Sequence, residues 1–455
     1  MGASFFHGKK EMTRDLTTGS PTKVLWQFSL PLLGSVLFQQ MYNLADSLVA
    51  GKLISEDALS AVGNAYEVTL IYLAFAFGCN IGCSVVLSQL FGAKKIADLK
   101  TAVTTNFIFS GALTLVLMAL GFCFAPALLE LIQVPEALRA QTLTYLNIYT
   151  GGLIFLFFYN ISNGIFTALG DSKTPFLFLA ASSTANVFVD ILFVKVFPHW
   201  GIGAVAWATF LCQGVSCVLA VLTVLRKLRL LQSEAKPRLF DTAILWRIIR
   251  IALPSTLQQS FISIGNIVIQ SVINGLGGPV IAGYSAAVKI NNFAVTSFTT
   301  LGNGISNYTA QNLGAGQKER VRKGTRAGLL MMILIAVSFS AVYVLLREQL
   351  VGLFMKEQGT AALGIGCRYL LIIAPFYAVI CIKICCDGVL RGAGAMRYFM
   401  ITTFTDLVLR AALAVVLAPV WGSDGVWFAW PVGWVIATVM STVFYLSGVW
   451  KRSHV

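Results

Sequence analysis

Twelve long apolar runs constrain the fold of this chain more than any other feature. A helix needs about 20 apolar residues to cross roughly 30 Å of hydrocarbon. Hydrophobic residues make up 57% of the 455 positions and charged residues only 11%, whereas an average soluble protein has roughly 25% charged residues. A transmembrane barrel needs alternating polarity, which these runs lack. The sequence therefore predicts an all-α polytopic membrane protein with spans at 24–51, 58–91, 101–125, 142–169, 175–197, 203–225, 251–274, 280–312, 327–346, 366–390, 398–420 and 425–449.

The chain also repeats itself, with a second copy about 222 residues after the first. Pro31 recurs as Pro254, Gln89 as Gln311 and Gly170 as Gly392. Paired repeats are a common plan for transporters, because two similar bodies can rock about a central site. Each copy holds an even number of spans, so the copies are parallel. We expect two pseudo-symmetric six-helix lobes, with an N-terminal segment at 1–23, a first lobe at 24–230, a linker at 231–250 and a second lobe at 251–455.

The net charge of +14 is a signal of topology. Of the 33 basic residues, 24 fall in the termini and in loops on one side of the predicted spans. The positive-inside rule places that side in the cytoplasm, together with both termini. The polar residues 1–23 do not form a cleavable signal peptide. The sequence thus predicts a multi-pass protein of the plasma membrane and no nucleic-acid partner.

Histidine, the usual zinc ligand and general base, is absent from the predicted spans. The three histidines, His7, His199 and His454, lie outside them. All nine cysteines lie inside spans, where histidine company and access are lacking, which favours packing over metal binding or redox chemistry. These features disfavour a membrane-embedded lipid-modifying enzyme. An ion channel would need a symmetric pore, which one duplicated chain supplies poorly.

Carboxylates inside spans are costly, so each is a candidate functional group. Asp46 lies in the first span, and Asp190 lies in the fifth, four residues after Asn186 and on the same helix face. Asn160 and Asn163 share a face of the fourth span. Together these side chains would hold one proton or ligate one sodium ion, and two nearby carboxylates would not both ionise easily. For the three asparagines, hydrogen bonds that only join helices remain an equal alternative.

Several motifs together resemble those of the MATE (multidrug and toxic compound extrusion) family, in its bacterial type. They are Pro31 with Gln39-Gln40, Asn43 and Ala45-Asp46-Ser47; Ala58-Leu59-Ser60-Ala61-Val62-Gly63; Ser88-Gln89-Leu90-Phe91-Gly92-Ala93; and the turns at Gly170 and Gly392. The resemblance covers essentially the whole chain. It implies two six-helix lobes forming a V around a central cavity. It also implies export of amphipathic, often cationic compounds in exchange for inward H⁺ or Na⁺, with no other cofactor.

The resemblance also implies roles for particular residues. The N-lobe cation site of DinF-like members is matched by Asp46, Asp190, Asn186, Asn160 and Asn163. If the ion is Na⁺, the expected ligands are Asp46, Asp190 and Asn186. Tyr145 and Thr209 lie near further positions of that site. NorM-like members also carry acidic residues in the seventh helix, where this chain has Gln258 and Gln259. We therefore expect the coupling site in the first lobe. Gln39, Tyr42 and Asn163 are expected to line the drug pocket, with Glu67 attracting cationic substrate.

Other residues are candidates for a hinge, for a gate or for ion pairs within one helix. Pro31 removes a backbone hydrogen bond and should break the first helix, either as a hinge or as static packing. Glu67 and Lys289 lie at equivalent repeat positions, so we hypothesise that they pair across the outer cleft; separate local partners are the alternative. Opposite charges four residues apart, Lys383 with Asp387 and Asp406 with Arg410, should neutralise each other on their own helices.

The sequence thus predicts a cation-coupled multidrug efflux antiporter that works by alternating access. Its partners would be small-molecule drugs, organic cations and membrane lipids, and it would act as a monomer. A flippase for lipid-linked oligosaccharides in the same superfamily is the main alternative. Such flippases often have fourteen helices and intramembrane arginines, whereas this chain offers twelve spans and essentially only Arg410.

Overall fold

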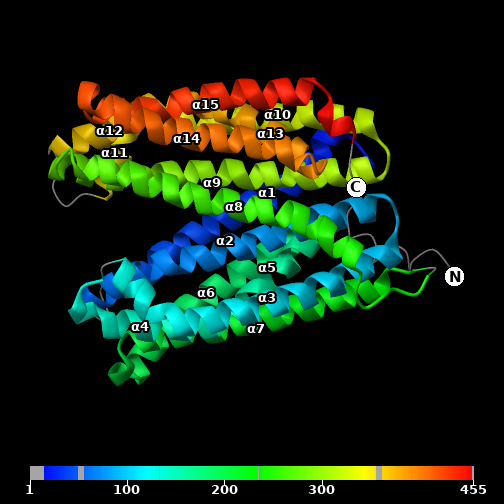
Figure 1. Cartoon of the computed structure of the whole chain (residues 1–455), viewed down its shortest axis with the longest axis horizontal. Coiled ribbons are helices and arrows are strands. Elements are labelled where there is room, and N and C mark those ends of the chain that lie inside the picture. The colour runs from blue at the N-terminus through cyan, green and yellow to red at the C-terminus, as the bar shows by residue number, and fades with distance from the viewer. Residues whose placement is uncertain (1–14, 50–55, 133, 234, 355–360, 453–455) are drawn as a thin grey trace. The chain divides into compact units, whose positions relative to one another are not determined.

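The computed structural model describes residues 15–49, 56–132, 134–233, 235–354 and 361–452, without the side chains of 42–49, 56–59, 67 and 452. Throughout these ranges the regular structure is helical (Figure 1). The first half contains α1 (Pro21–Val49), α2 (Glu56–Gly92), α3 (Ile96–Leu131), α4 (Glu136–Gly151), α5 (Leu153–Ala168), α6 (Lys173–Val196), η3 (Pro198–Trp200) and α7 (Ile202–Leu230). The second half contains α8 (Thr242–Asn274), α9 (Gly278–Gly314), α10 (Lys318–Leu345), α11 (Arg347–Gly352), α12 (Ala361–Ile373), η4 (Ala374–Phe376), α13 (Tyr377–Gly392), α14 (Met396–Trp421), α15 (Ser423–Leu446) and η5 (Val449–Arg452).

These helices account for the predicted membrane spans. Among the described residues, eight spans meet the criteria of length and apolarity, and α4 with α5 adds a ninth as a bent pair. The remaining three are α1, α8 and α9, with 29, 33 and 37 residues, each longer than the ~20 residues that a span needs. The predicted all-α polytopic fold is confirmed.

Two predicted spans are broken at equivalent places in the repeat. The fourth span bends by 49° between α4 and α5, at the pair Gly151-Gly152. In the second half, the 3-10 turn η4 containing Pro375 interrupts the helix between α12 and α13. Gly152 and Ala374 are 222 positions apart, so the two breaks are copies of one feature. Sequence analysis treated both spans as continuous.

The chain divides into two compact units that exchange helix ends. The first unit holds Leu30–Thr256, and the second holds Leu16–Ser29 together with Leu257–Val455. Helix α1 therefore begins in the second unit and continues in the first. Helix α8 begins in the first unit and continues in the second.

Both exchanged helices run through a proline without interruption. Helix α1 is a single helix from Pro21 to Val49 although Pro31 lies inside it, and α8 likewise contains Pro254. The hydroxyl of Ser35 donates to the Pro31 carbonyl at 3.0 Å. The expectation that Pro31 breaks the helix is wrong, because the flanking turns keep their helical geometry. The hinge role remains a prediction.

Close helix packing within each unit depends on glycine. In the second unit, α13 packs on α9, and a Cβ at Gly388 would lie 2.7 Å from the Gly302 carbonyl oxygen. In the first unit, where α5 lies among α2, α3 and α7 (Figure 1), a Cβ at Gly164 would lie 2.9 Å from the Asn80 carbonyl oxygen. Small residues of this kind let helix backbones approach closely in a membrane protein.

The segments that precede α1 and α8 are tied down at equivalent positions. In the second unit, the Arg320 guanidinium donates to the carbonyls of Leu16, Thr18 and Gly19, and the amide of Leu16 donates to Gln311 Oε1 at 3.0 Å. In the first unit, the amides of Arg238 and Asp241 donate to the hydroxyls of Thr101 and Thr105 at 2.9 and 3.1 Å. Residues 16–19 and 238–241 are 222 positions apart. We call these segments the first strap and the second strap.

Candidate functional site

The predicted polar residues of the fourth and fifth spans lie on α5 and α6 of the first unit. Asn160 and Asn163 belong to α5, and Asn186 and Asp190 belong to α6. Asp190 is completely buried and Asn186 is 4% exposed. Because they are one turn apart, the two side chains project from one face of α6. A buried carboxylate has therefore been placed beside an amide, as the sequence predicts.

Three further side chains connect this face of α6 to its neighbours. Ser182 precedes Asn186 by one turn on α6, and Tyr159, whose hydroxyl is buried, lies one turn before Asn163 on α5. On α7, which packs against α6, Cys212 lies near Asn186 and Asp190. The structure thus links α5, α6 and α7 around the predicted residues.

Sequence reasoning missed Tyr159, Ser182 and Cys212. The position of Ser182, four residues before Asn186, was the available signal, since it places a third polar group on the same face. Tyr159, four residues before Asn163 on α5, carried the same signal, whereas no pattern marked Cys212, because it lies on a different helix.

Asn160 makes contacts that fit the stapling alternative. Its Nδ2 donates to the Leu156 carbonyl of its own helix at 2.8 Å. Its backbone carbonyl accepts a hydrogen bond from Asn80 Nδ2 of α2 at 2.6 Å. These bonds fasten α2 to α5, as polar side chains commonly do between membrane helices. A role for Asn160 as an ion ligand remains a prediction.

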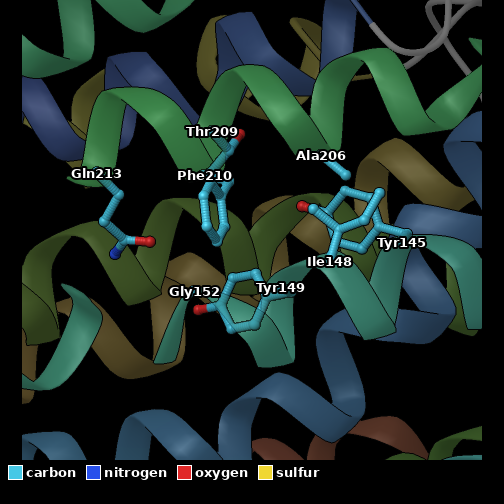
Figure 2. A pocket seen from close by; sticks show the side chains of 8 residues that line it. All are labelled: Tyr145, Ile148, Tyr149, Gly152, Ala206, Thr209, Phe210 and Gln213. Carbon is cyan, nitrogen blue, oxygen red and sulfur yellow. The ribbon is translucent and has the colours of Figure 1, made fainter. Parts of the chain in front are cut away.

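Tyr145 and Thr209, the two residues added from the family resemblance, line one pocket. Figure 2 shows this pocket between α4 with its cap residue, which supply Tyr145, Ile148, Tyr149 and Gly152, and α7, which supplies Ala206, Thr209, Phe210 and Gln213. The hydroxyl oxygen of Thr209 is buried and has no hydrogen-bond partner among the described residues. The pocket therefore adjoins the helix that carries Cys212.

The remaining predicted site residues are only partly described. The side chains of Tyr42, Asp46 and Glu67 lie outside the described residues, so the cluster around Asp46 and the proposed pair of Glu67 with Lys289 stay predictions. Gln39 is exposed on α1, as a lining residue of an open cavity would be. Lys289 is exposed on α9, where its amino group lies 5.6 Å from the centre of the Phe354 ring.

The predicted charge pairs of the second unit had different outcomes. Lys383 Nζ lies 2.7 Å from Asp387 Oδ2, which confirms that pair. The hydroxyls of Ser441 and Thr402 donate to the other oxygen of Asp387, at 2.6 and 3.2 Å. Asp387 is therefore fully engaged in helix packing.

Asp406 and Arg410, in contrast, are not among the ion pairs found in the described part of the chain. The guanidinium of Arg410 instead lies 4.2 Å from the centre of the Trp430 ring on α15. The prediction of this pair is wrong, because the π-face of a neighbouring helix takes the cation.

The chain is similar to known transporter proteins along nearly its whole length. The sequence pattern of the family described as MatE matches it twice, over residues 31–192 and 254–416, which confirms the internal duplication. The "Probable multidrug resistance protein YpnP" of Bacillus subtilis (strain 168) is 28% identical over 96% of this chain and 97% of its own length. The "FAD transporter" of Shewanella oneidensis (strain ATCC 700550 / JCM 31522 / CIP 106686 / LMG 19005 / NCIMB 14063 / MR-1) is 24% identical over 74% of this chain and 75% of its own length.

A solved structure has the same fold. It is described as the outward-facing conformation of a multidrug resistance MATE family transporter of the MOP superfamily. The TM-score is 0.89 at 22% sequence identity, and the alignment covers 97% of this chain and 100% of that chain. At this identity the likeness concerns the fold alone.

Proposed function

The chain belongs to the MatE family, and from this premise we propose that it is a cation-coupled multidrug efflux antiporter. It exports amphipathic, mostly cationic organic compounds by alternating access, in exchange for inward H⁺ or Na⁺, and needs no other cofactor. Proteins of this family are transporters, so the alternative of a lipid-modifying enzyme falls away. We further propose that it acts as a monomer among the lipids of the plasma membrane, with both termini in the cytoplasm.

The burial of Asp190 carries this proposal. Asp190 is completely buried in a helix apolar and long enough to span a membrane. A carboxylate at such a place is costly unless it serves a function, and ion pathways and proton relays are the usual functions. Asn186, one turn before it on α6, and Cys212 of the neighbouring α7 lie near it and supply polar groups that suit either a protonated carboxyl or a bound cation.

Coupling requires only that the ion and the drug prefer different conformations. With a proton or Na⁺ at Asp190 and Asp46, the buried site is close to neutral and favours one arrangement of the first unit. Without the ion, the negative charge favours a second arrangement that accepts a cationic drug. The drug and the ion therefore exclude each other, which is the logic of an antiporter.

The cations of the second unit argue against the flippase alternative. A carrier of pyrophosphate-linked lipids would present intramembrane cations to the phosphates. Here Arg410 lies over Trp430, and Lys383 is paired with Asp387. Neither is presented for phosphate binding.

Transport by reconstituted protein tests the proposal. Efflux of a fluorescent organic cation from proteoliposomes is measured under an imposed pH gradient and then under a Na⁺ gradient. Asp190→Asn should reduce gradient-driven efflux by roughly 5–150-fold, the usual range of coupling between sites. Glu130→Gln is the matched control, because Glu130 is an exposed carboxylate at the end of α3 in the same unit.

Two outcomes would overturn the proposal. Full gradient-driven efflux by Asp190→Asn would remove this carboxylate from coupling. Transport of FAD without transport of any organic cation would replace the proposed substrate class, and FAD is included because a relative is named for it.

A further inference from the structure

The second strap of the first unit presents apolar and basic side chains together at its surface. Leu239 is 73% exposed and Phe240 is 39% exposed. The side chain of Arg238, directly before them, is 70% exposed, and Lys236 is exposed as well. Neighbouring apolar side chains that are rimmed by polar ones mark a site of contact with a membrane or a protein. We therefore expect this surface to have a partner.

The first strap, its duplicate in the second unit, has a different surface. There Leu16 is completely buried, and the next two residues are Thr17 and Thr18. The second strap has arginine, leucine and phenylalanine at these repeat positions, and all three are exposed. The apolar and basic surface is thus a property of the second copy and not a requirement of the shared fold.

The two straps are also held in different ways. Arg320 donates to three carbonyls of the first strap, whereas the residue at its repeat position is Asp98. An ionised carboxylate has no hydrogen to donate to a backbone carbonyl. The second strap is bonded instead through its amides, to the hydroxyls of Thr101 and Thr105. Asp98 therefore cannot close the second strap as Arg320 closes the first.

The position of the second strap along α3 indicates that it lies at the membrane surface. Helix α3 has 36 residues and is about 54 Å long, roughly 24 Å more than the hydrocarbon core requires. When the helix is centred in the bilayer, each end extends about 12 Å beyond the hydrocarbon. Thr101 and Thr105, which hold the strap, lie about 8 and 14 Å from the start of α3 at Ile96. The strap is therefore at the boundary between head groups and hydrocarbon, at the end of the unit where α2 turns into α3 (Figure 1).

The charges of the strap and of the first turns of α8 favour an anionic partner. Residues 236–250 include four basic residues and one acidic residue: Lys236, Arg238, Arg247, Arg250 and Asp241. Asp241 is already engaged, because it accepts the amides of Ala243 and Ile244 at 2.9 and 3.0 Å and pairs with Arg238 at 2.8 Å. The buried Nε of Arg247 has no hydrogen-bond partner among the described residues. Clusters of four or more basic residues beside a membrane helix are typical of sites for anionic lipids.

A tryptophan completes the surface. Trp246 is 62% exposed on the second turn of α8, directly before Arg247. Tryptophan is enriched at the level of the lipid head groups, where its ring is amphipathic in the same sense as the interface. Phosphate suits the basic residues, and the acyl chains suit the exposed apolar ones. A phospholipid supplies both groups in one molecule.

We propose that the second strap and the first turns of α8 form a binding site for an anionic phospholipid. Lys236, Arg238 and Arg250 contact the phosphate head group, while Leu239 and Phe240 lie against the acyl chains. The orientation proposed above makes this a lipid of the cytoplasmic leaflet. The bound lipid closes the second strap, as Arg320 closes the first.

Lipid binding to the detergent-solubilised full chain tests the site without any transport. Native mass spectrometry should show tighter binding of dioleoyl phosphatidylglycerol than of dioleoyl phosphatidylcholine, which has the same acyl chains. Lys236→Gln with Arg238→Gln should weaken binding of phosphatidylglycerol by about 30-fold, since each basic residue at a membrane surface contributes roughly fivefold. Lys318→Gln with Lys323→Gln is the matched control, because it removes the same charge from two exposed residues of α10.

Hydrogen exchange locates the bound lipid. In nanodiscs, replacing phosphatidylcholine by phosphatidylglycerol should slow exchange at the amides of Leu239 and Phe240. Exchange at Thr17 and Thr18 of the first strap should stay the same. The double variant Leu239→Thr with Phe240→Thr gives the second strap the residues of the first at these positions, and it should lose most of the added protection.

Three results would overturn the proposal. The first is equal binding of the two lipids, and the second is undiminished binding of phosphatidylglycerol by Lys236→Gln with Arg238→Gln. The third is displacement of phosphatidylglycerol by soluble glycerol phosphate, which would make this a site for free phosphate. Equal protection of both straps in nanodiscs would likewise show a general effect of membrane charge. A calorimetric melting temperature checks that each variant is folded.

Discussion

Removing the Arg320 side chain should release the first strap, Leu16–Gly19, while leaving the second unit folded. Arg320 Nη1 donates to the Gly19 carbonyl at 2.6 Å, and Nη2 donates to the carbonyls of Thr18 and Leu16 at 2.7 and 3.2 Å. Leu16 is completely buried, and Asn312 Nδ2 also donates to its carbonyl at 3.3 Å. Arg320→Ala removes the three guanidinium bonds and keeps the apolar contact of Leu16.

The expected loss follows from these bonds. A hydrogen bond to a charged group contributes about 1.5–3 kcal/mol when buried, and a typical one about 0.5–1.5 kcal/mol. The bonds to Thr18 and Gly19 are exposed to solvent, and the bond to Leu16 is long and only partly buried, so the lower range applies to all three. The three together stabilise the strap by about 2 kcal/mol, which corresponds to a roughly 30-fold change in the equilibrium between bound and released strap.

Hydrogen exchange measures this equilibrium at the Leu16 amide, which Gln311 Oε1 protects in the bound strap. In Arg320→Ala, exchange at Leu16 should accelerate roughly 30-fold, while the buried helix α13 should exchange as before. Arg322→Ala is the matched control, because Arg322 lies two residues away on α10 with its side chain exposed. Unchanged exchange at Leu16 would refute the reasoning, since it would mean that Leu16 packing and Asn312 hold the strap without Arg320.

Two further predictions concern stability, read from thermal unfolding in detergent. Lys383→Ala leaves the carboxylate of Asp387 buried without its cation, so it should destabilise the protein by about 3–5 kcal/mol. The double variant Lys383→Met with Asp387→Leu should recover most of that loss. If Lys383→Ala is as stable as the wild type, the pair has no structural role. Lys94 adopts a left-handed φ of +58°, and its repeat equivalent Gly316 has φ +74°. Lys94→Gly should therefore stabilise the turn after α2 by about 1 kcal/mol, and Gly316→Lys should destabilise the turn after α9. A lower melting temperature for Lys94→Gly together with a higher one for Gly316→Lys would contradict this prediction.

The fold could be predicted because its signals are local or repeated. Span length, apolarity and the offset of about 222 residues predicted a helical membrane protein with two copies of one plan. Spacing of four residues predicted that Asn186 and Asp190 share a face, and that Lys383 meets Asp387. Each of these inferences needs only the period of one helix.

What sequence could not predict depends on contacts between helices. Arg410 has Asp406 one turn away on its own helix, yet it lies over Trp430 of α15, a preference that no spacing on α14 reveals. Cys212 joins the candidate site only because α7 packs beside α6. The exchange of helix ends was hidden for the same reason, since nothing within residues 16–29 reveals which unit they pack against. Partner choice in a helix bundle is a tertiary property.

The exchanged helices and the straps together make a prediction about motion. Helices α1 and α8 each belong to both units, and each changes unit within three residues of its proline, Pro31 or Pro254. Proline removes one backbone hydrogen bond, so bending costs least there. Any displacement of one unit against the other must pass through these two helices, and the first strap holds the start of α1 to the second unit while this happens.

The effects of Pro31 and Arg320 on transport should therefore be coupled, and a double-mutant cycle on the efflux rate measures that coupling. Pro31→Ala stiffens α1 and should slow transport when the helix start is held by Arg320. Once Arg320→Ala has freed that start, α1 can shift as a whole, and stiffening at residue 31 should matter much less. The two effects on ln(rate) should thus be strongly non-additive, with a coupling of about 1 kcal/mol or more. Additive effects would mean that bending at Pro31 and anchoring by the first strap are independent, because two residues that share no moving element do not couple.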